Sequence, residues 1–232
     1  MKTYTIHLIR HGLTQGNADG KYIGRTDLPL SETGVALLGD LVQTCTYPTA
    51  DVYFCSPLTR CLQTLEIIYP GAVPLVIPDF RECNFGRFEE RTAQELSDDP
   101  EFLQWMNDPS YTPPEGESAA AFTNRTLAAF ESVVEGLFKT GTQSAVIVAH
   151  GGTIMAIMSA FGLPRAKFYE WAVAPARGYT IRIQPRLWTS GKVFEVCGTL
   201  PADETQGSED KDLVDLGREA ASRAYKNDDQ EG

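Results

Sequence analysis

The chain has 232 residues, enough for one large α/β domain or two small ones, and its 42% hydrophobic and 22% charged residues are typical of a soluble globular protein. Its formal net charge of −11 argues against binding nucleic acid or an anionic membrane through bulk charge. No apolar run reaches the roughly 20 residues of a membrane helix, and nothing after Met1 resembles a signal peptide.

The acidic residues are concentrated at one end of the chain. Residues 201–232 hold ten acidic and four basic side chains, a net charge of −6, which leaves −5 of the total −11 for residues 1–200. We expect residues 1–200 to form the folded domain and residues 201–232 to be an acidic extension. Asp212–Tyr225 places four apolar side chains near one helical face, so this extension is expected to dock as a helix or otherwise to be disordered.

The cysteines indicate the compartment. They are odd in number and contain no Cys-x-x-Cys pair: Cys45, Cys55, Cys61, Cys83 and Cys197. We therefore expect reduced thiols in a cytoplasmic protein, without a disulfide framework or a zinc site. The sequence carries no signal for an oligomeric state.

In chain order, the first part of the sequence alternates short strands and helices. We predict a strand over Tyr4–Ile9, a loop over 12–29, a helix from the N-cap Ser31 to about Thr44, a strand over Asp51–Cys55, a helix from Pro57 to about Ile68, and a strand over Val73–Ile77. His7 alternates with apolar neighbours in the first strand and is expected to be a buried sheet residue rather than a site residue.

The rest of the chain continues the alternation. We predict short helices over Thr92–Leu96 and Pro100–Asn107, a turn at 113–116, a long helix from Glu117 to about Lys139, a strand over Ser144–Ala149, a helix to Phe161, and two adjacent strands over Gly178–Gln184 and Lys192–Cys197. This order of elements predicts a three-layer α/β/α sandwich with a mostly parallel central sheet and a short helical lid.

Three strand-to-helix junctions carry groups suited to phosphate. Arg10-His11-Gly12 follows the first strand, Arg60 lies in the first turn of the helix after Ser56-Pro57, and His150-Gly151-Gly152 follows the 144–149 strand. Ligands of open α/β sheets bind outside the carboxyl ends of the strands. Arginine forks and helix N-termini bind phosphate oxygens, so the three junctions together predict a phosphate site.

Four segments in this order resemble the histidine phosphatase (phosphoglycerate mutase-like) superfamily. Residues 10–17 resemble its R-H-G-x-T-x-x-N signature, residues 56–64 its S-P-L-x-R-A-x-Q-T segment, residues 82–86 its E-x-x-F-G segment, and residues 149–152 its second-histidine segment. The third of these segments continues as F-G-x-W-E-G-x-T in many members, and residues 85–92 depart from it. Phe88 keeps the aromatic side chain, but Glu90 replaces the second glycine. This replacement puts the local turn in doubt but not the assignment of Glu82.

The resemblance implies a role for each matched residue. His11 would attack the phosphorus and form a phosphohistidine, while Glu82 would act as general acid and then as general base. The phosphoryl oxygens would be held by Arg10, Asn17, Arg60 and His150, with Gly151 beside them. Glu89 and Glu90 are competing carboxylates near Glu82. The scheme needs no metal and no cofactor.

The resemblance leaves three functions open: a phosphatase for a small phosphorylated metabolite, a phosphoglycerate mutase, and a non-catalytic phospho-ligand binding protein. The mutases carry a longer, more basic insertion before the second histidine, whereas residues 92–124 contain no Lys or Arg. The phosphatase is therefore favoured, and the binding protein is disfavoured because His11 and Glu82 are both present.

The substrate is left open as well. Short-lid chains of this kind include α-ribazole phosphatase-like enzymes, broad-specificity sugar phosphatases and fructose-bisphosphatase-type members. The P-x-G-E-S segment at 114–118 does not choose among them. We expect selectivity to come from residues 20–28, with Gly24 and Arg25 as candidates, and from residues 100–125. Trp105 and Tyr111 are interpreted as packing residues rather than as a lid over substrate.

Overall fold

A computed structural model describes residues 2–202. Of the extension expected at 201–232, residues 203–232, with the Asp212–Tyr225 segment, lie outside the described residues. A seven-stranded sheet runs through the described part of the chain in the order β3-β2-β4-β1-β6-β7-β5. The strands are β1 (Tyr4–Arg10), β2 (Val52–Cys55), β3 (Leu75–Val76), β4 (Ser144–Ala149), β5 (Gly162–Leu163), β6 (Gly178–Ile183) and β7 (Phe194–Leu200). Four of the six neighbouring pairs are parallel, which confirms the predicted mostly parallel sheet; only β6 runs against its neighbours β1 and β7.

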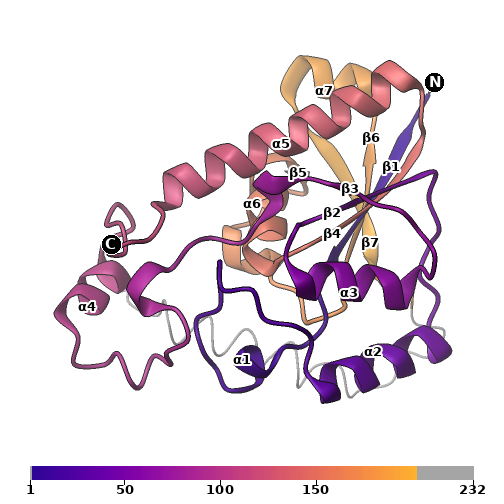
Figure 1. Cartoon of the computed structure of the whole chain (residues 1–232). Helices are drawn as coiled ribbons and strands as arrows, with labels where there is room; N and C mark the ends of the chain where they lie inside the picture. Colours follow the sequence, from indigo (N-terminus) through magenta and orange to yellow (C-terminus); the bar gives the residue numbers. More distant parts are fainter. Residues whose placement is uncertain (1, 203–232) are drawn as a thin grey trace.

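Helices cover both faces of this sheet, as Figure 1 shows. They are α1 (Gln15–Ala18), α2 (Glu32–Thr44), α3 (Thr59–Ile68), α4 (Pro100–Asn107), α5 (Ala119–Thr140), α6 (Gly151–Phe161) and α7 (Pro185–Gly191), with 3-10 turns at η1 (Pro78–Phe80), η2 (Gly86–Phe88) and η3 (Phe168–Trp171). Helices α2 and α3 pack on one face, and α5, α6 and α7 on the other. The three-layer α/β/α architecture is therefore confirmed.

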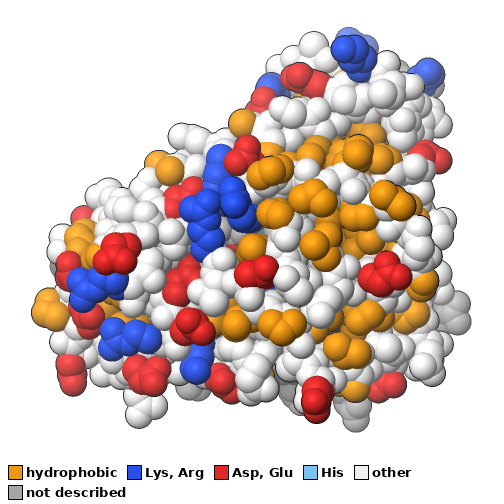
Figure 2. All heavy atoms as spheres, viewed as in Figure 1, with side chains coloured by type: hydrophobic (Ala, Val, Ile, Leu, Met, Phe, Trp, Pro, Cys, Tyr) orange, Lys and Arg blue, Asp and Glu red, His pale blue; other side chains and the backbone are white. Residues whose placement is uncertain are grey.

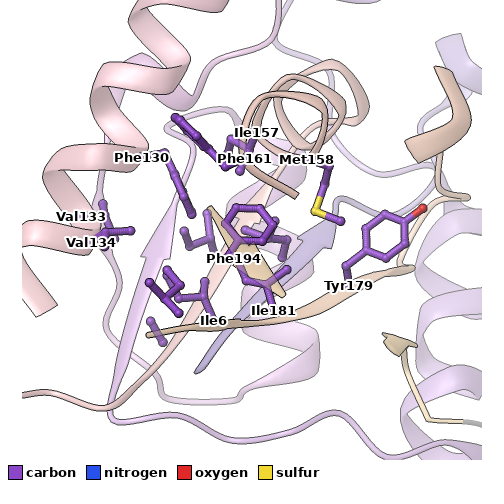
Figure 3. Close-up of a cluster of buried hydrophobic side chains, with 14 of the residues drawn as sticks. Ile6, Phe130, Val133, Val134, Ile157, Met158, Phe161, Tyr179, Ile181 and Phe194 are labelled. Carbon is purple, nitrogen blue, oxygen red and sulfur yellow. The ribbon is translucent and has the colours of Figure 1, made fainter. Parts of the chain in front are cut away.

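The central strand β4 explains why the chain has two main cores. Its apolar residues are all buried because a strand between two helical layers has no solvent face. Ala145 and Ile147 point into the core shared with α5 and α6, whereas Val146 and Val148 point into the core shared with α2 and α3. Figure 3 shows the first core, where aromatic and aliphatic side chains from α5, α6, β1, β6 and β7 meet.

The sheet edge at β3 is more exposed than its centre. Val73, Leu75 and Val76 are exposed there, and Figure 2 shows hydrophobic side chains gathered on the side of the molecule where Figure 1 places β3 and α3. The edge strand is only two residues long. A strand this short offers few unpaired backbone groups to another chain, which limits edge-to-edge pairing.

A third, smaller core lies in the segment between η2 and α4. Phe88, Leu96 and Phe102 are buried there, with Tyr22 and Trp105 among the half-buried side chains packed on them. Figure 1 shows α4 standing away from the sheet, as a short helical lid would. Trp105 contacts the rings of Tyr22, Phe85, Phe88 and Phe102, which agrees with its interpretation as a packing residue.

The predicted helix over Thr92–Leu96 is wrong: this segment forms turns. Thr92 and Glu95 do exchange capping bonds, since the Thr92 amide donates to Glu95 Oε2 at 2.7 Å and the Glu95 amide donates to Thr92 Oγ1 at 3.2 Å. A helix cannot continue from them because the residue before a proline is pushed out of the helical region, and Asp99 before Pro100 is extended.

The helix predicted from Pro57 begins two residues later, at Thr59. Leu58 is still extended, and the amide and hydroxyl of Thr59 both donate to the carboxylate of Asp27, at 2.7 and 2.9 Å. A side chain 32 residues away thus caps the helix, which no local pattern signals. Residues 185–191, which lie between the last two predicted strands, form helix α7 with Pro185 in its first turn.

Candidate active site

The three predicted junctions meet at one edge of the sheet. Strands β1 and β2 both pair in parallel with β4, so their carboxyl ends lie together. The His11 amide donates to the Ala149 carbonyl at 3.0 Å, and the imidazole rings of His11 and His150 lie 5.2 Å apart, both buried. The chain therefore brings together residues that are 139 positions apart in sequence (150 − 11).

His11 is held in one tautomer. Its Nδ1 lies 2.7 Å from the carbonyl oxygen of Gly12, an acceptor, so Nδ1 carries the proton and Nε2 keeps its lone pair. Gly12 is fixed in turn because its amide donates to Thr64 Oγ1 at 2.8 Å. Burial, helped by Arg60 and Arg10, lowers the pKa of His11 well below its usual value. The ring is therefore neutral at neutral pH.

Arg10 and Arg60 each keep one buried donor without a partner. Arg10 Nη1 donates to the Val173 carbonyl at 2.7 Å, and Arg60 donates through Nη1 and Nη2 to the carbonyls of Thr26 and Gly24, at 2.8 and 2.6 Å. Among residues 2–202, neither Nε has a hydrogen-bond partner. A buried donor left unpaired costs about 1–3 kcal/mol, so two such cationic donors indicate an anion site.

His150 lies beside them, at the start of α6. Its Nε2 is 2.7 Å from Ser56 Oγ, which follows β2, and 3.6 Å from Cys61 Sγ in α3. Burial first, and then the charge of Arg60, lowers its pKa well below the usual value. The serine of the Ser56-Pro57 segment is thus in hydrogen-bond contact with the second histidine.

Glu82 is the one buried carboxylate among the described residues, with 8% of its surface exposed. Its Oε1 accepts from the Cys83 amide at 2.9 Å and its Oε2 from the Gly152 amide at 2.8 Å. Burial raises the pKa of Glu82, although both hydrogen bonds, Arg60 and Arg10 oppose this. Burial outweighs these opposing effects, so the pKa of Glu82 lies above the ordinary value of a glutamate.

Glu89, one of the competing carboxylates, fixes a loop instead. It accepts from the amides of Arg25 and Thr26, each at 2.7 Å, and from the Phe85 amide at 3.0 Å. The carbonyls on the other side of that loop bind Arg60, so Gly24 and its neighbours orient the guanidinium. A Cβ on Gly24 would lie 1.8 Å from the Cys83 carbonyl oxygen, so only glycine fits.

The other predicted site residues have weaker ties to the site. Asn17 lies in α1, where its Oδ1 accepts from the hydroxyl of Thr14 at 2.9 Å. Gly151 begins α6, and a Cβ there would be 3.5 Å from Arg10 Nε. Arg25 is exposed. Roles for these three residues in binding phosphate or substrate stay predictions.

The sequence reasoning missed Arg125, whose guanidinium reaches the backbone of residues 79–82 from α5. Within residues 2–202, no group of three or more His, Cys, Asp or Glu side chains could hold a metal ion. None of the described helices combines the length and the apolar character of a membrane span.

The chain belongs to the histidine phosphatase superfamily (branch 1), whose family model matches residues 6–195. It is 30% identical over 199 residues to the adenosylcobalamin/alpha-ribazole phosphatase of Salmonella typhimurium, covering 83% of this chain and 92% of that protein. It is also 30% identical over 189 residues to a 2,3-bisphosphoglycerate-dependent phosphoglycerate mutase of Bifidobacterium longum, covering 67% and 76% of the two chains.

Solved structures give the same two names. The alpha-ribazole phosphatase from Shigella flexneri matches with a TM-score of 0.72 at 25% identity, over 88% of this chain and all of that one (100%). A phosphoglycerate mutase from Thermus thermophilus matches with a TM-score of 0.62 at 29% identity, over 86% and 99%. These matches establish the superfamily and the fold of this chain. The similar proteins include both phosphatases and mutases.

Proposed function

We propose that this chain is a metal-independent phosphatase that hydrolyses small phosphomonoesters through a phosphohistidine on His11. One observation carries the proposal: a buried, neutral His11, with its Nε2 lone pair available, lies with two arginines whose Nε donors lack partners. A nucleophile with cationic donors for the oxygens around it is the arrangement that phosphoryl transfer requires.

In the first step, Nε2 of His11 attacks phosphorus in line with the leaving oxygen. The P–N bond forms as the P–O bond breaks, and the leaving oxygen takes the electron pair of that bond and the proton of Glu82. Arg10, Arg60, Asn17 and His150 would hold the equatorial oxygens as charge shifts. The alcohol then leaves, and the enzyme retains a phosphohistidine at His11 and an ionised Glu82 carboxylate.

In the second step, the Glu82 carboxylate takes a proton from a water molecule. The water oxygen attacks phosphorus, the P–N bond breaks, and its electron pair returns to Nε2. Inorganic phosphate is released, and Glu82 is again protonated. The cycle uses neither a metal nor a cofactor.

The phosphatases among the relatives support hydrolysis, and the mutases among them make phosphate return the alternative. Hydrolysis is favoured by the charge of the lid region. Residues 92–124 contain no Lys or Arg, and the guanidinium of Arg125, the next basic residue, is occupied by Glu117 and three backbone carbonyls. A second anionic group on the substrate would find few free cations there. We further propose a cytoplasmic location, supported by cysteines spaced as isolated thiols.

Phosphate release from p-nitrophenyl phosphate tests the proposal. We expect turnover by the wild type and a loss of at least roughly 10³-fold in His11→Ala, since removing a nucleophile costs this much or more. His7→Gln is the matched control, because His7 lies in β1 with its Nδ1 3.0 Å from Thr180 Oγ1 and outside the site. Undiminished turnover by His11→Ala would exclude the mechanism. Isomerisation of 3-phosphoglycerate faster than phosphate release would favour the mutase.

A further inference from the structure

Arg125 binds the backbone that leads into Glu82. It lies in α5, and its Nη1 donates to the carbonyls of Asp79 and Arg81, both at 2.8 Å, while its Nη2 donates to the carbonyl of Glu82 itself at 3.0 Å. A single guanidinium therefore satisfies three carbonyls within four residues. Such multiple contacts fix the path of an irregular segment more firmly than one bond can.

Glu117 completes the grip from the other side. Its carboxylate accepts from Nε and Nη2 of Arg125 in a bidentate pair, each at 2.7 Å, and both side chains are half-buried. The Glu117 amide also donates to the Asn84 carbonyl at 2.8 Å. The segment on either side of Glu82 is thus tied to the start of α5. This is the glutamate of the P-x-G-E-S segment.

The carboxyl end of Glu82 is held separately, by the amides of Cys83 and Gly152. Glu82 is therefore fixed at its backbone by α5 and at its carboxyl group by α6. We infer that Arg125, together with Glu117, is a positioning pair that sets where Glu82 delivers its proton to the leaving oxygen. This inference rests on the function proposed above, in which Glu82 is the general acid.

A general acid matters most when the leaving group is poor. An alkoxide must be protonated as it departs, whereas p-nitrophenolate leaves without help. Displacing Glu82 therefore slows the transfer to His11 selectively for alkyl phosphates, but a general loss of folded enzyme slows both substrates equally. Arg125→Lys keeps the charge yet loses the fork that reaches three carbonyls and a carboxylate at once.

The experiment compares kcat/KM for glycerol 1-phosphate and p-nitrophenyl phosphate in four enzymes: wild type, Arg125→Lys, Glu117→Gln and Glu82→Gln. This parameter reports phosphoryl transfer to His11 and excludes the later hydrolysis of the phosphohistidine, in which Glu82 acts as base for both substrates. We expect both positioning variants to lose about 10²-fold on the alkyl phosphate and less than about 5-fold on the aryl phosphate. Arg165→Lys is the matched control, since Arg165 is an exposed arginine that donates to one carbonyl, Ala160, at 2.6 Å. Equal losses on both substrates in the positioning variants would overturn the inference.

Two further readouts separate positioning from folding and from the proposed function. In the Glu82→Gln background, Arg125→Lys should cause little further loss, because the two residues act as one unit. Independently of any activity, hydrogen exchange at the Cys83 and Gly152 amides should accelerate at least about 10-fold in Arg125→Lys, with exchange in β4 unchanged. Unchanged exchange at both amides would overturn the inference even in an enzyme without phosphatase activity, whereas failure of the His11 test alone would overturn only the proposed function.

Discussion

At the scale of single residues, the site sets two pKa values in opposite directions by the same cause. Burial disfavours the charged form of each group, so it lowers the pKa of His11 and raises that of Glu82. Neutral imidazole and neutral carboxylic acid are the two forms that the first chemical step requires. The nearby arginines reinforce the shift of His11 and oppose that of Glu82.

This pair predicts the pH dependence. The activity supplied by Glu82 is present while it holds its proton and is lost as the pH rises through its elevated pKa, whereas His11 stays neutral until well below pH 6.5. The ratio of wild-type to Glu82→Gln kcat/KM on an alkyl phosphate removes the titration of the substrate itself. We expect this ratio to fall as pH rises above the ordinary range of a glutamate. A ratio that is flat with pH would contradict the role of Glu82.

Gly152 is predicted to be required by Glu82. A Cβ at this position would lie 2.4 Å from Glu82 Oε1, so Gly152→Ala must displace the carboxyl group that its amide now binds. We expect kcat/KM on an alkyl phosphate to fall by roughly 10–100-fold, as for misplacement of a catalytic group by about 1 Å. Gly136→Ala in α5, where nothing lies within 4 Å of the new Cβ, should leave activity unchanged. Full activity of Gly152→Ala would show that Glu82 is not held here.

At the scale of elements, the site is supported by three loops that interlock through close backbone contacts. Residues 24–26 pack on Cys83, and residues 113–117 pack on Gly86, whose φ is +55° and whose Cβ would be 2.0 Å from the Pro114 carbonyl oxygen. Glu89 and Arg60 hold residues 24–26 from opposite sides of the backbone. The loops therefore position Glu82 and Arg60 as one unit.

Glu90 stands where the family's pattern has glycine, and the turn here keeps the left-handed conformation that glycine favours. Its φ is +61°, and its amide donates to the Tyr22 carbonyl at 2.9 Å. The left-handed conformation costs a residue other than glycine about 1–2 kcal/mol. Glycine avoids this strain, but it loses more conformational entropy on folding, which offsets part of the gain. We predict that Glu90→Gly raises the free energy of unfolding by about 0.5–1 kcal/mol in urea titrations. As a control, Glu135→Gly on the exposed side of α5 should lower the free energy of unfolding by about 1 kcal/mol. If Glu90→Gly also lowered it, the backbone at Glu90 would not be strained.

The elements that could be predicted are those that local pattern determines. Strand β4 is continuously apolar because it is buried on both faces, and the histidines and Arg60 follow strands at positions that a parallel sheet brings together. The cap of α3 by Asp27 and the grip of Arg125 on Glu82 could not be read from the sequence, because each joins residues more than 30 positions apart. The sequence indicates Glu89 only as an alternative to Glu82. Its role in holding residues 24–26 could not be predicted, because its amide partners depend on how the loops pack.

At the scale of the whole molecule, an anionic substrate must approach a strongly acidic protein. The net charge is −11, of which residues 203–232 contribute −6. Arg10 and Arg60, which we propose bind phosphate, are buried and act at short range, whereas the overall field acts out to about a Debye length, ~8–10 Å at physiological salt. The negative net charge therefore opposes the approach of an anionic substrate, whereas the buried arginines attract its phosphate once it has entered the site.

This arrangement predicts an inverse salt effect. Between about 20 and 200 mM salt, kcat/KM for a dianionic phosphomonoester should rise about two- to threefold, because screening weakens the repulsion. A chain ending at Ala202 has a net charge of −5 (−11 + 6), so its salt dependence should be weaker. A fall in kcat/KM with salt in both proteins would show that the field at the site is attractive.

Acid-free quenching of the enzyme during turnover tests the central claim most directly. The wild type is mixed with p-nitrophenyl phosphate, stopped in alkali within milliseconds, digested with trypsin and analysed by mass spectrometry. Cleavage after Arg10 and Lys21 places His11 alone among the three histidines on the peptide 11–21. We predict an alkali-stable, acid-labile phosphate on this peptide, absent from His11→Ala. Steady hydrolysis with no phosphate on it, or with the phosphate on the peptide that carries His150, would contradict the assignment of His11 as the nucleophile.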